Sequence, residues 1–146
     1  MFNARAVTMA ALLAGFGAAV AFAGPIEDRQ ALMKGNGKDI GALAAMLKGE
    51  KAYDAAAVKE HAAQIADHIQ KFVTLFPEDS KEGPPETYAK AEIWTDMDGF
   101  KMAAENASKA AQEVASTSDE AGFKAAMPKL GDACGACHKK YRRPKD

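Results

Sequence analysis

Residues 51–77 read KAYDAAAVKEHAAQIADHIQKFVTLFP and decide the fold class, because they contain a complete helix signature. Asp54 is a residue type that caps helix N-termini, and Pro77 cannot continue a helix. The apolar residues between them recur in steps of three and four, at Val58, Ala62, Ile65, Ile69, Phe72 and Phe76. The stretch therefore predicts one amphipathic helix whose apolar side packs against other helices.

Two more helices are predicted on either side of this stretch. A helix from Asp28 to about Lys48 has its inward stripe at positions 29, 32, 33, 36, 40, 43 and 47, and ends at Gly49. A helix from about Tyr88 to Ala115 has its inward stripe at positions 93, 97, 100, 104, 107, 111 and 114. The polar residues 78–90, with a Pro-Pro pair, form the long loop that precedes it.

A fourth helix follows Asp119, another capping residue type. Its inward stripe is Phe123, Met127, Leu130, Cys134, Cys137 and Tyr141. Pro128 falls inside this helix and should kink it. Because β-branched residues are few and no segment alternates like a strand, the sequence predicts an all-α protein, an antiparallel up-down four-helix bundle.

The first 23 residues are predicted to be a cleaved secretory signal peptide. Arg5 precedes an uncharged run, and Ala21-Phe22-Ala23 fits the small-x-small rule for cleavage. The run is rich in Ala and Gly and short for a bilayer span of about 20 strongly apolar residues, so a retained anchor is the weaker interpretation. Residues 24–146 then form one exported domain with no later membrane span.

The charge balance argues against nucleic acid as a partner. Cleavage after residue 23 removes one cation, which leaves 18 Lys and Arg against 20 Asp and Glu, a net charge of −2. Phosphate binding needs a concentrated basic surface.

The chain's only cysteines, Cys134 and Cys137, are three residues apart, and His138 follows directly. A disulfide between them would close a tiny loop and add little stability. A thioredoxin-like dithiol needs a βαβ surround, and zinc needs about four ligands, for which only His61 and His68 remain. The pattern predicts one covalent haem c, attached through both cysteines, with His138 as an axial ligand of its iron.

With these motifs the chain resembles the class II cytochromes c, the family of cytochrome c prime. The resemblance rests on DRQALMK at 28–34, LFPEDS at 75–80, EIW at 92–94 and CGACHKKYR at 134–142. In the c prime branch the sixth iron position is open and takes small gases. In the low-spin branch, the cytochrome c-556 type, a methionine of the first helix fills it. Residues 32–54 are more similar to the low-spin branch.

The resemblance implies that Met33 is the distal iron ligand, and the bundle geometry agrees. The first and last helices are antiparallel, so the partner of His138 should lie near the start of the first helix. Met33 lies about 10 Å along that helix, whereas Met46 lies about 30 Å along it. Met97 is the competitor, although its stripe position favours core packing. Bis-histidine ligation through His61 or His68 is another alternative, but both are expected to be half-exposed.

Three further residues are assigned to the haem environment by the resemblance. Trp94 is expected to pack on the haem, with an ordinary core position as the alternative. Arg142, four residues after His138, is expected over the proximal side or a propionate; otherwise it satisfies the last helix carbonyls. Arg29, four residues before Met33, is expected near the haem edge, with a solvated role as the alternative.

The predicted function is one-electron transfer in the bacterial periplasm rather than enzyme catalysis, because both axial positions are filled by protein. The competing function is a high-spin cytochrome c prime that binds NO or CO at an open position, and a peroxidase ranks third. The expected partners are redox proteins, which the basic residues 139–145 could steer, unless those cations only complement a helix C-terminus. A homodimer is a further expectation from the resemblance.

Overall fold

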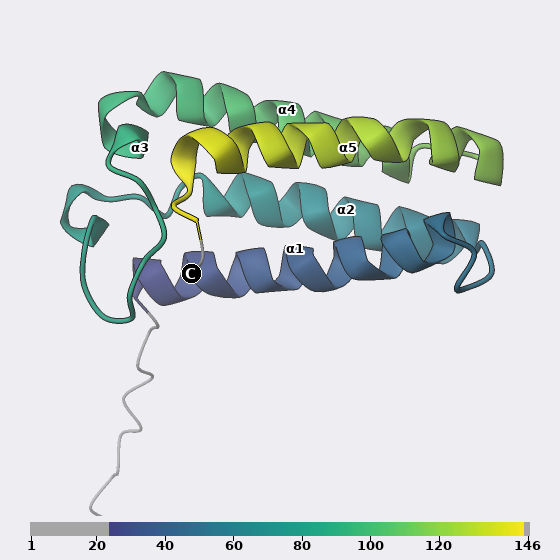
Figure 1. Ribbon diagram of the computed structural model, residues 1–146, viewed down its shortest axis with the longest axis horizontal. Helices are drawn as coiled ribbons and strands as arrows, with labels where there is room; N and C mark the ends of the chain where they lie inside the picture. The colour runs from purple at the N-terminus through teal and green to yellow at the C-terminus, as the bar shows by residue number, and fades with distance from the viewer. Residues whose placement is uncertain (1–23, 145–146) are drawn as a thin grey trace, which may run out of the picture.

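The computed structural model describes residues 24–144, so the predicted signal peptide, residues 1–23, lies outside the described residues. Four long helices form an antiparallel bundle, which confirms the predicted fold class (Figure 1). They are α1 (Pro25–Leu47), α2 (Ala55–Phe72), α4 (Met97–Ala115) and α5 (Glu120–Tyr141). A 3-10 turn η1 (Glu78–Ser80) and a single-turn helix α3 (Glu92–Thr95) lie in the connection between α2 and α4.

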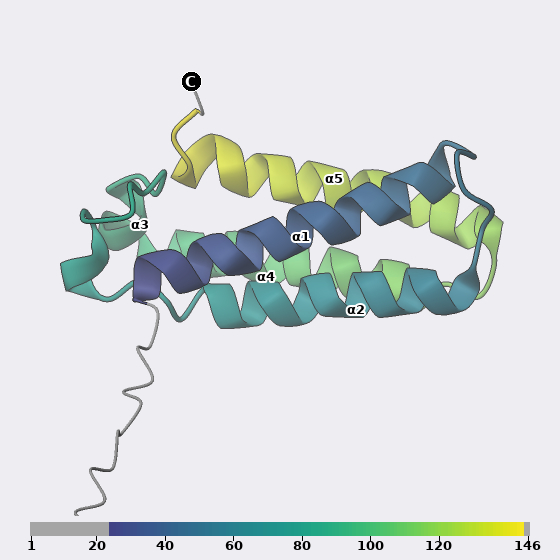
Figure 2. The same ribbon diagram turned by 90° about the horizontal axis from the view of Figure 1, so that it is seen from below.

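Each long helix packs mainly against the long helix that precedes or follows it in the chain. α1 packs along α2, α2 along α4, and α4 along α5, whereas α1 and α5 make few contacts with one another (Figure 2). The start of α1, the end of α5 and the long connection through α3 lie at the same end of the bundle (Figure 1). The first helix therefore begins, and the last helix finishes, at the end of the bundle where the terminal motif lies.

Two of the predicted helix starts are confirmed at the level of hydrogen bonds. Asp54 accepts hydrogen bonds from the backbone N–H groups of Ala56 at 2.9 Å and Ala57 at 3.1 Å. Asp119 accepts from the N–H of Gly122 at 2.8 Å. Each carboxylate satisfies donors that have no partner inside the helix and stabilises a helix start by about 1 kcal/mol.

The prediction of one helix from Tyr88 to Ala115 is wrong at its start. Ala89 pairs with Arg142 in an isolated antiparallel bridge, and the helical path is interrupted at Asp96, which has φ −136° and ψ 53°. The carboxylate of Asp96 accepts from the N–H of Gly99 at 3.2 Å and so begins α4. An aspartate that binds the backbone in this way competes with continuous helix.

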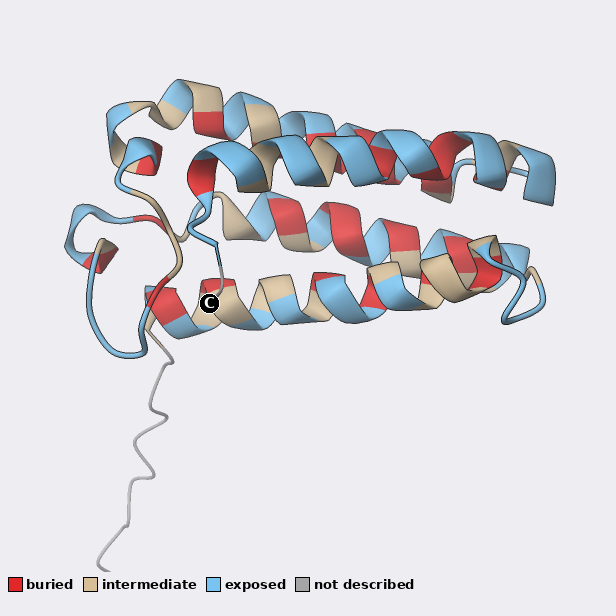
Figure 3. Cartoon of the chain, in the orientation of Figure 1, coloured by how far each residue is buried: buried red, intermediate tan, exposed pale blue. Residues whose placement is uncertain are grey.

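The core consists of two clusters along the inward faces of the helices (Figure 3). The larger one runs along α2 and α4, where alanines such as Ala62 and Ala111, both fully buried, allow the two helices to approach closely. The smaller cluster, Phe76, Ile93, Phe100 and Tyr141, lies at the α3 end of the bundle. Its rings meet edge to face, with 4.8 Å between the centroids of Phe76 and Phe100.

Helix α1 differs from the others, because three of its buried residues are polar. The stripe predicted for it includes positions 29 and 36, where Arg29 is 3% exposed and Asn36 is 9% exposed. Asp39, also on α1, is 4% exposed. Buried polar groups need partners, and the loop and α2 supply them. Within residues 24–144, no helix is long and apolar enough to cross a bilayer.

Candidate functional site

The terminal motif lies in the last two turns of α5. Cys134 and Cys137 are free thiols, both half-buried. Cys134 packs against the larger core cluster and Cys137 against the smaller one. The pair therefore spans the junction between the clusters, on a helix that makes few contacts with α1.

Burial controls the charge of the motif. Desolvation raises the pKa of Cys134, and it raises the pKa of Cys137 to about 11, with a smaller effect from Cys134 itself. Desolvation, assisted by the positive charge of Arg142, lowers the pKa of His138. At neutral pH the motif therefore presents two uncharged thiols and an uncharged imidazole, which is the form of histidine that binds a metal.

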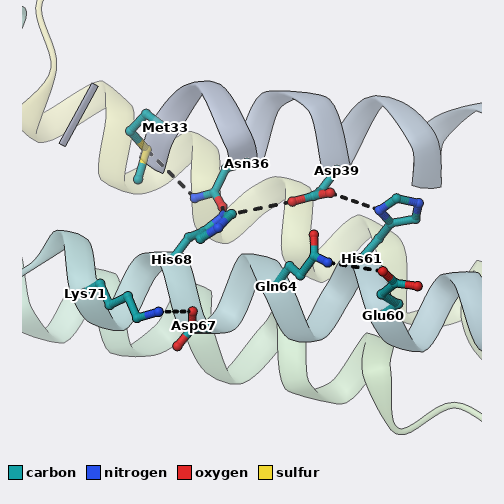
Figure 4. A network of polar contacts seen from close by, with 9 residues as sticks. All are labelled: Met33, Asn36, Asp39, Glu60, His61, Gln64, Asp67, His68 and Lys71. Carbon is teal, nitrogen blue, oxygen red and sulfur yellow. Dashed lines mark hydrogen bonds and ion pairs between the residues drawn. The ribbon is translucent and has the colours of Figure 1, made fainter. Parts of the chain in front are cut away.

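Met33 lies on α1 and is half-buried. The side-chain amide of Asn36, one turn further along the helix, donates to the Met33 thioether with 4.0 Å between Nδ2 and Sδ (Figure 4). The competing methionines have other surroundings. Met46 is buried in the larger cluster, and Met97 packs against the smaller one, as expected for core residues.

His61 and His68 are half-buried on the face of α2 that packs against α1 (Figure 4). The Nδ1 atom of His68 lies 3.0 Å from Oδ1 of Asn36, and the Nδ1 atom of His61 lies 2.9 Å from Oδ1 of Asp39. The second oxygen of Asp39 is 3.9 Å from Nδ1 of His68. Sequence reasoning missed the roles of Asn36 and Asp39. The signal was available, since polar residues at 36 and 39 extend the face of Met33 while two histidines share one face of α2.

Arg29 is not solvated, so that alternative is wrong. Its Nη1 atom donates to the carbonyl of Leu75 at 3.2 Å and to the hydroxyl of Ser80 at 2.9 Å. Its Nη2 atom donates to the carbonyl of Ser80 and the hydroxyl of Thr87, both at 2.8 Å. Burial lowers the pKa of Arg29, and the guanidinium lies 4.8 Å from the centroid of the Phe76 ring. Arg29 therefore ties the long connection to α1.

Trp94 lies beside this arginine. Its indole N–H donates to the carbonyls of Phe76 and Pro77, each at 3.1 Å, and its ring meets Phe76 edge to face at 5.6 Å. Trp94 and Cys137 pack against the same smaller cluster. A place in the haem environment stays a prediction for Trp94.

Arg142 is the C-cap of α5 and lies one turn beyond His138, as predicted; its place near the haem stays a prediction. α5 ends at Tyr141, and Arg142 is exposed with extended backbone, φ −118° and ψ 134°. Its backbone N–H, rather than its guanidinium, satisfies the carbonyl of His138, at 3.0 Å. The bridge to Ala89 turns the chain away from the helix axis.

Two of the four cations that the structure describes in the tail are bound within the fold. Lys140 forms an ion pair with Asp96 at 2.6 Å, and Arg143 donates to the carbonyl of Thr87 and lies 3.5 Å from a carboxylate oxygen of Glu86. Their charges are therefore partly neutralised locally. Lys139 and Arg142 are exposed at the same end of the bundle.

The chain is similar in sequence and in structure to c-type cytochromes. The model of the family described as cytochrome C' matches residues 24–142. A cytochrome c-556 from Agrobacterium tumefaciens (strain II Chrys) is 42% identical over 125 residues, which cover 84% of this chain and 100% of that protein.

Two solved structures illustrate the structural likeness. Cytochrome c' from Rhodopseudomonas palustris has a TM-score of 0.79 and 35% identity, over 86% of this chain and 100% of that one. The nitric oxide complex of a mutant of cytochrome c prime from Alcaligenes xylosoxidans has a TM-score of 0.73 and 25% identity, over 84% of this chain and 99% of that one.

Proposed function

Because this chain belongs to the cytochrome c' family, we propose that it carries single electrons through a haem c attached at Cys134 and Cys137, with His138 and Met33 as axial ligands. Proteins of this family bind haem c covalently, with its iron. The haem supplies the one-electron change between ferric and ferrous iron. The chain's own residues attach it, orient it and keep water from it.

The residues fit this cofactor. Both thiols are free and uncharged, and one helical turn separates them, which suits attachment at two neighbouring points of one ring. The uncharged imidazole of His138 follows directly and is half-buried. α1 and α5 make few contacts, so a flat group can lie between them without displacing a packed interface. The apolar clusters on either side of the motif would exclude water.

The observation that carries the low-spin proposal is the position of Met33. Its thioether is half-buried on α1, near the helix start, and α1 begins at the end of the bundle where α5 finishes. A methionine in the sixth position would leave no site for an external ligand, and histidine with methionine stabilises ferrous iron relative to two histidines. The protein would then be a carrier rather than an enzyme.

A gas-binding function is the second candidate, and the relatives favour it as well as the first. They include both cytochromes c-556 and cytochromes c', and the Alcaligenes structure is a nitric oxide complex. In that case Met33 would pack beside the haem without binding iron.

Arg29 has all four Nη hydrogens on protein acceptors, so only its Nε–H would remain for a haem propionate. Arg142 is free to approach one from the exposed edge.

The proposed location is the periplasm, reached through the signal sequence of residues 1–23. The proposed partners are redox proteins that dock near the end of α5, where Lys139 and Arg142 are exposed. A homodimer is proposed from the family likeness.

The test is an absorption spectrum of the exported holoprotein, oxidised, reduced, and reduced under carbon monoxide. We expect a low-spin spectrum that changes little with carbon monoxide. Met33→Ala should become high-spin and bind carbon monoxide readily. Met97→Ala is the control, because Met97 is equally half-buried but packs on the smaller cluster, and it should keep the wild-type spectrum. A high-spin wild type that takes up carbon monoxide would establish the gas-binding candidate instead.

A further inference from the structure

We propose that Asn36 is a positioning residue for Met33: its amide N–H holds the thioether in place and withdraws electron density from the sulfur, while His68 fixes the amide. This inference rests on the proposed function, since it concerns the sulfur that would bind iron. It assigns to α2, which carries neither cysteine nor axial ligand, a part in setting the reduction potential.

The two ends of the Asn36 side chain have different partners. Oδ1 lies 3.0 Å from Nδ1 of His68, and Nδ2 lies 4.0 Å from Sδ of Met33 (Figure 4). An amide oxygen only accepts, so the Nδ1 atom of His68 carries the hydrogen. Because the amide is planar, a bond that fixes its oxygen also directs its NH₂ group toward the sulfur. Asn36 is 9% exposed, so water competes little for either end.

His68 is itself held in place. Asp39, 4% exposed, has one oxygen 3.9 Å from Nδ1 of His68 and the other bound to His61. The ring also lies against the backbone of α1 at Gly35, where an added Cβ would be 2.9 Å from Cε1 and 3.2 Å from Nδ1. A glycine at 35 therefore lets the imidazole reach Asn36. At Gly37, two residues further along α1, an added Cβ would have nothing within 4 Å.

A hydrogen bond to the sulfur would affect the iron in one direction. The thioether is a weak acceptor with two lone pairs, so it can accept from Asn36 and still bind a metal. Donation to the sulfur weakens its own donation to iron, and ferric iron depends on that donation more than ferrous iron does. The ferrous state is therefore favoured and the reduction potential rises. Outer hydrogen bonds tune metal sites in this way.

The experiment uses the exported holoprotein and measures two properties, the reduction potential and the near-infrared band of methionine bound to ferric haem. Asn36→Leu keeps the approximate size but removes the donor, and we expect a lower potential and a shifted or weakened band. Gly35→Ala should displace the His68 ring and change both properties in the same direction. Gly37→Ala is the matched control, because both alanines favour the helix but only the first meets His68.

Each outcome decides between the two proposals. A wild type without the methionine band overturns the proposed function and this inference with it. A wild type with the band, and an Asn36→Leu variant with the same band and potential, leaves the electron-carrier proposal standing and overturns the role of Asn36. If Gly35→Ala and Gly37→Ala shift the potential equally, then His68 does not act through the amide.

Discussion

The carboxylate of Asp96 accepts a hydrogen bond from the hydroxyl of Tyr141 at 2.8 Å. The two residues are 45 positions apart in the chain, and the bond joins the start of α4 to the last residue of α5. The same carboxylate caps α4 and pairs with Lys140. One side chain therefore connects the two helices at the end of the bundle that carries the cysteine motif.

Asp96 should make stability depend on acid pH. Its hydrogen bonds with Lys140 and then Tyr141 lower its pKa from 3.8. A carboxylate with a lowered pKa contributes stability in full above its unfolded pKa and loses that contribution as the pH falls through its folded pKa. Asp96→Asn should therefore lose less stability between neutral pH and pH 3 than the wild type does.

Urea unfolding of the holoprotein at a series of pH values measures this dependence. Lys140→Met removes the main cause of the lowered pKa and should flatten the curve in the same way. Parallel curves for Asp96→Asn and the wild type would contradict the assignment.

Arg29→Lys should destabilise the protein by about 2 kcal/mol, because a lysine cannot reproduce the planar set of four hydrogen bonds and leaves buried acceptors unsatisfied. Gln30→Ala is the control. Gln30 also donates to the long connection, at the carbonyl of Glu86, but it is half-buried and its hydrogen bond is exposed to solvent. Its loss should change the free energy of unfolding by no more than about 0.5 kcal/mol. Equal effects of the two changes in a denaturant titration would argue against a clamp at Arg29.

Ala111→Leu should destabilise the protein by about 1–3 kcal/mol, because Ala111 is 0% exposed between α2 and α4 and the added carbons have no space. Ala63→Leu, on the exposed side of α2, keeps the same change of residue type without the crowding. Thermal unfolding should show a lower midpoint for the first variant only. A tolerated leucine at 111 would mean that the α2 and α4 interface is looser than the packing indicates.

Changing either cysteine should alter haem attachment in a defined way. Cys134→Ser or Cys137→Ser should leave one thioether, so the haem stays with the denatured chain, while the double variant should release it. Mass spectrometry of the unfolded protein measures the retained haem. If the double variant kept its haem after denaturation, attachment at these cysteines would be excluded.

The four helices could be predicted from the sequence because their signals are local. Apolar steps of three and four define the faces of α2, and Asp54 and Asp119 begin helices as their residue type indicates. The break at Asp96 has a local part, the capping bond to the N–H of Gly99, and a part that could not be predicted in this way, because two further partners of the carboxylate, Lys140 and Tyr141, come from the other end of the chain. The residues next to Asp96 in the sequence do not indicate that Lys140 and Tyr141 are its partners.

The candidate site also has features that follow from local sequence and features that depend on residues far away in the chain. The spacing of Cys134, Cys137 and His138 is local, so the sequence predicts this motif without the fold. The burial of Arg29 depends on a loop more than 40 residues away in the sequence. Without knowledge of that loop, a solvent-exposed arginine is the ordinary expectation for a cation on a helix. The sequence likewise indicated two histidines on one face of α2, but their acceptors on α1 became visible only when the helices were paired.

The isolated bridge between Ala89 and Arg142 restrains the end of α5, the helix that carries the proposed iron ligand His138. The backbone N–H of Lys90 donates to the carbonyl of Tyr141 at 3.0 Å, and the backbone N–H of Arg143 donates to the carbonyl of Tyr88 at 2.7 Å. The last turn of a helix usually frays, but the last turn of α5 is hydrogen-bonded to residues 88–90, which are far away in the sequence. The backbone that carries His138 therefore has little freedom to tilt. If His138 binds the proposed haem iron, a centre held so stiffly would have a small reorganisation energy.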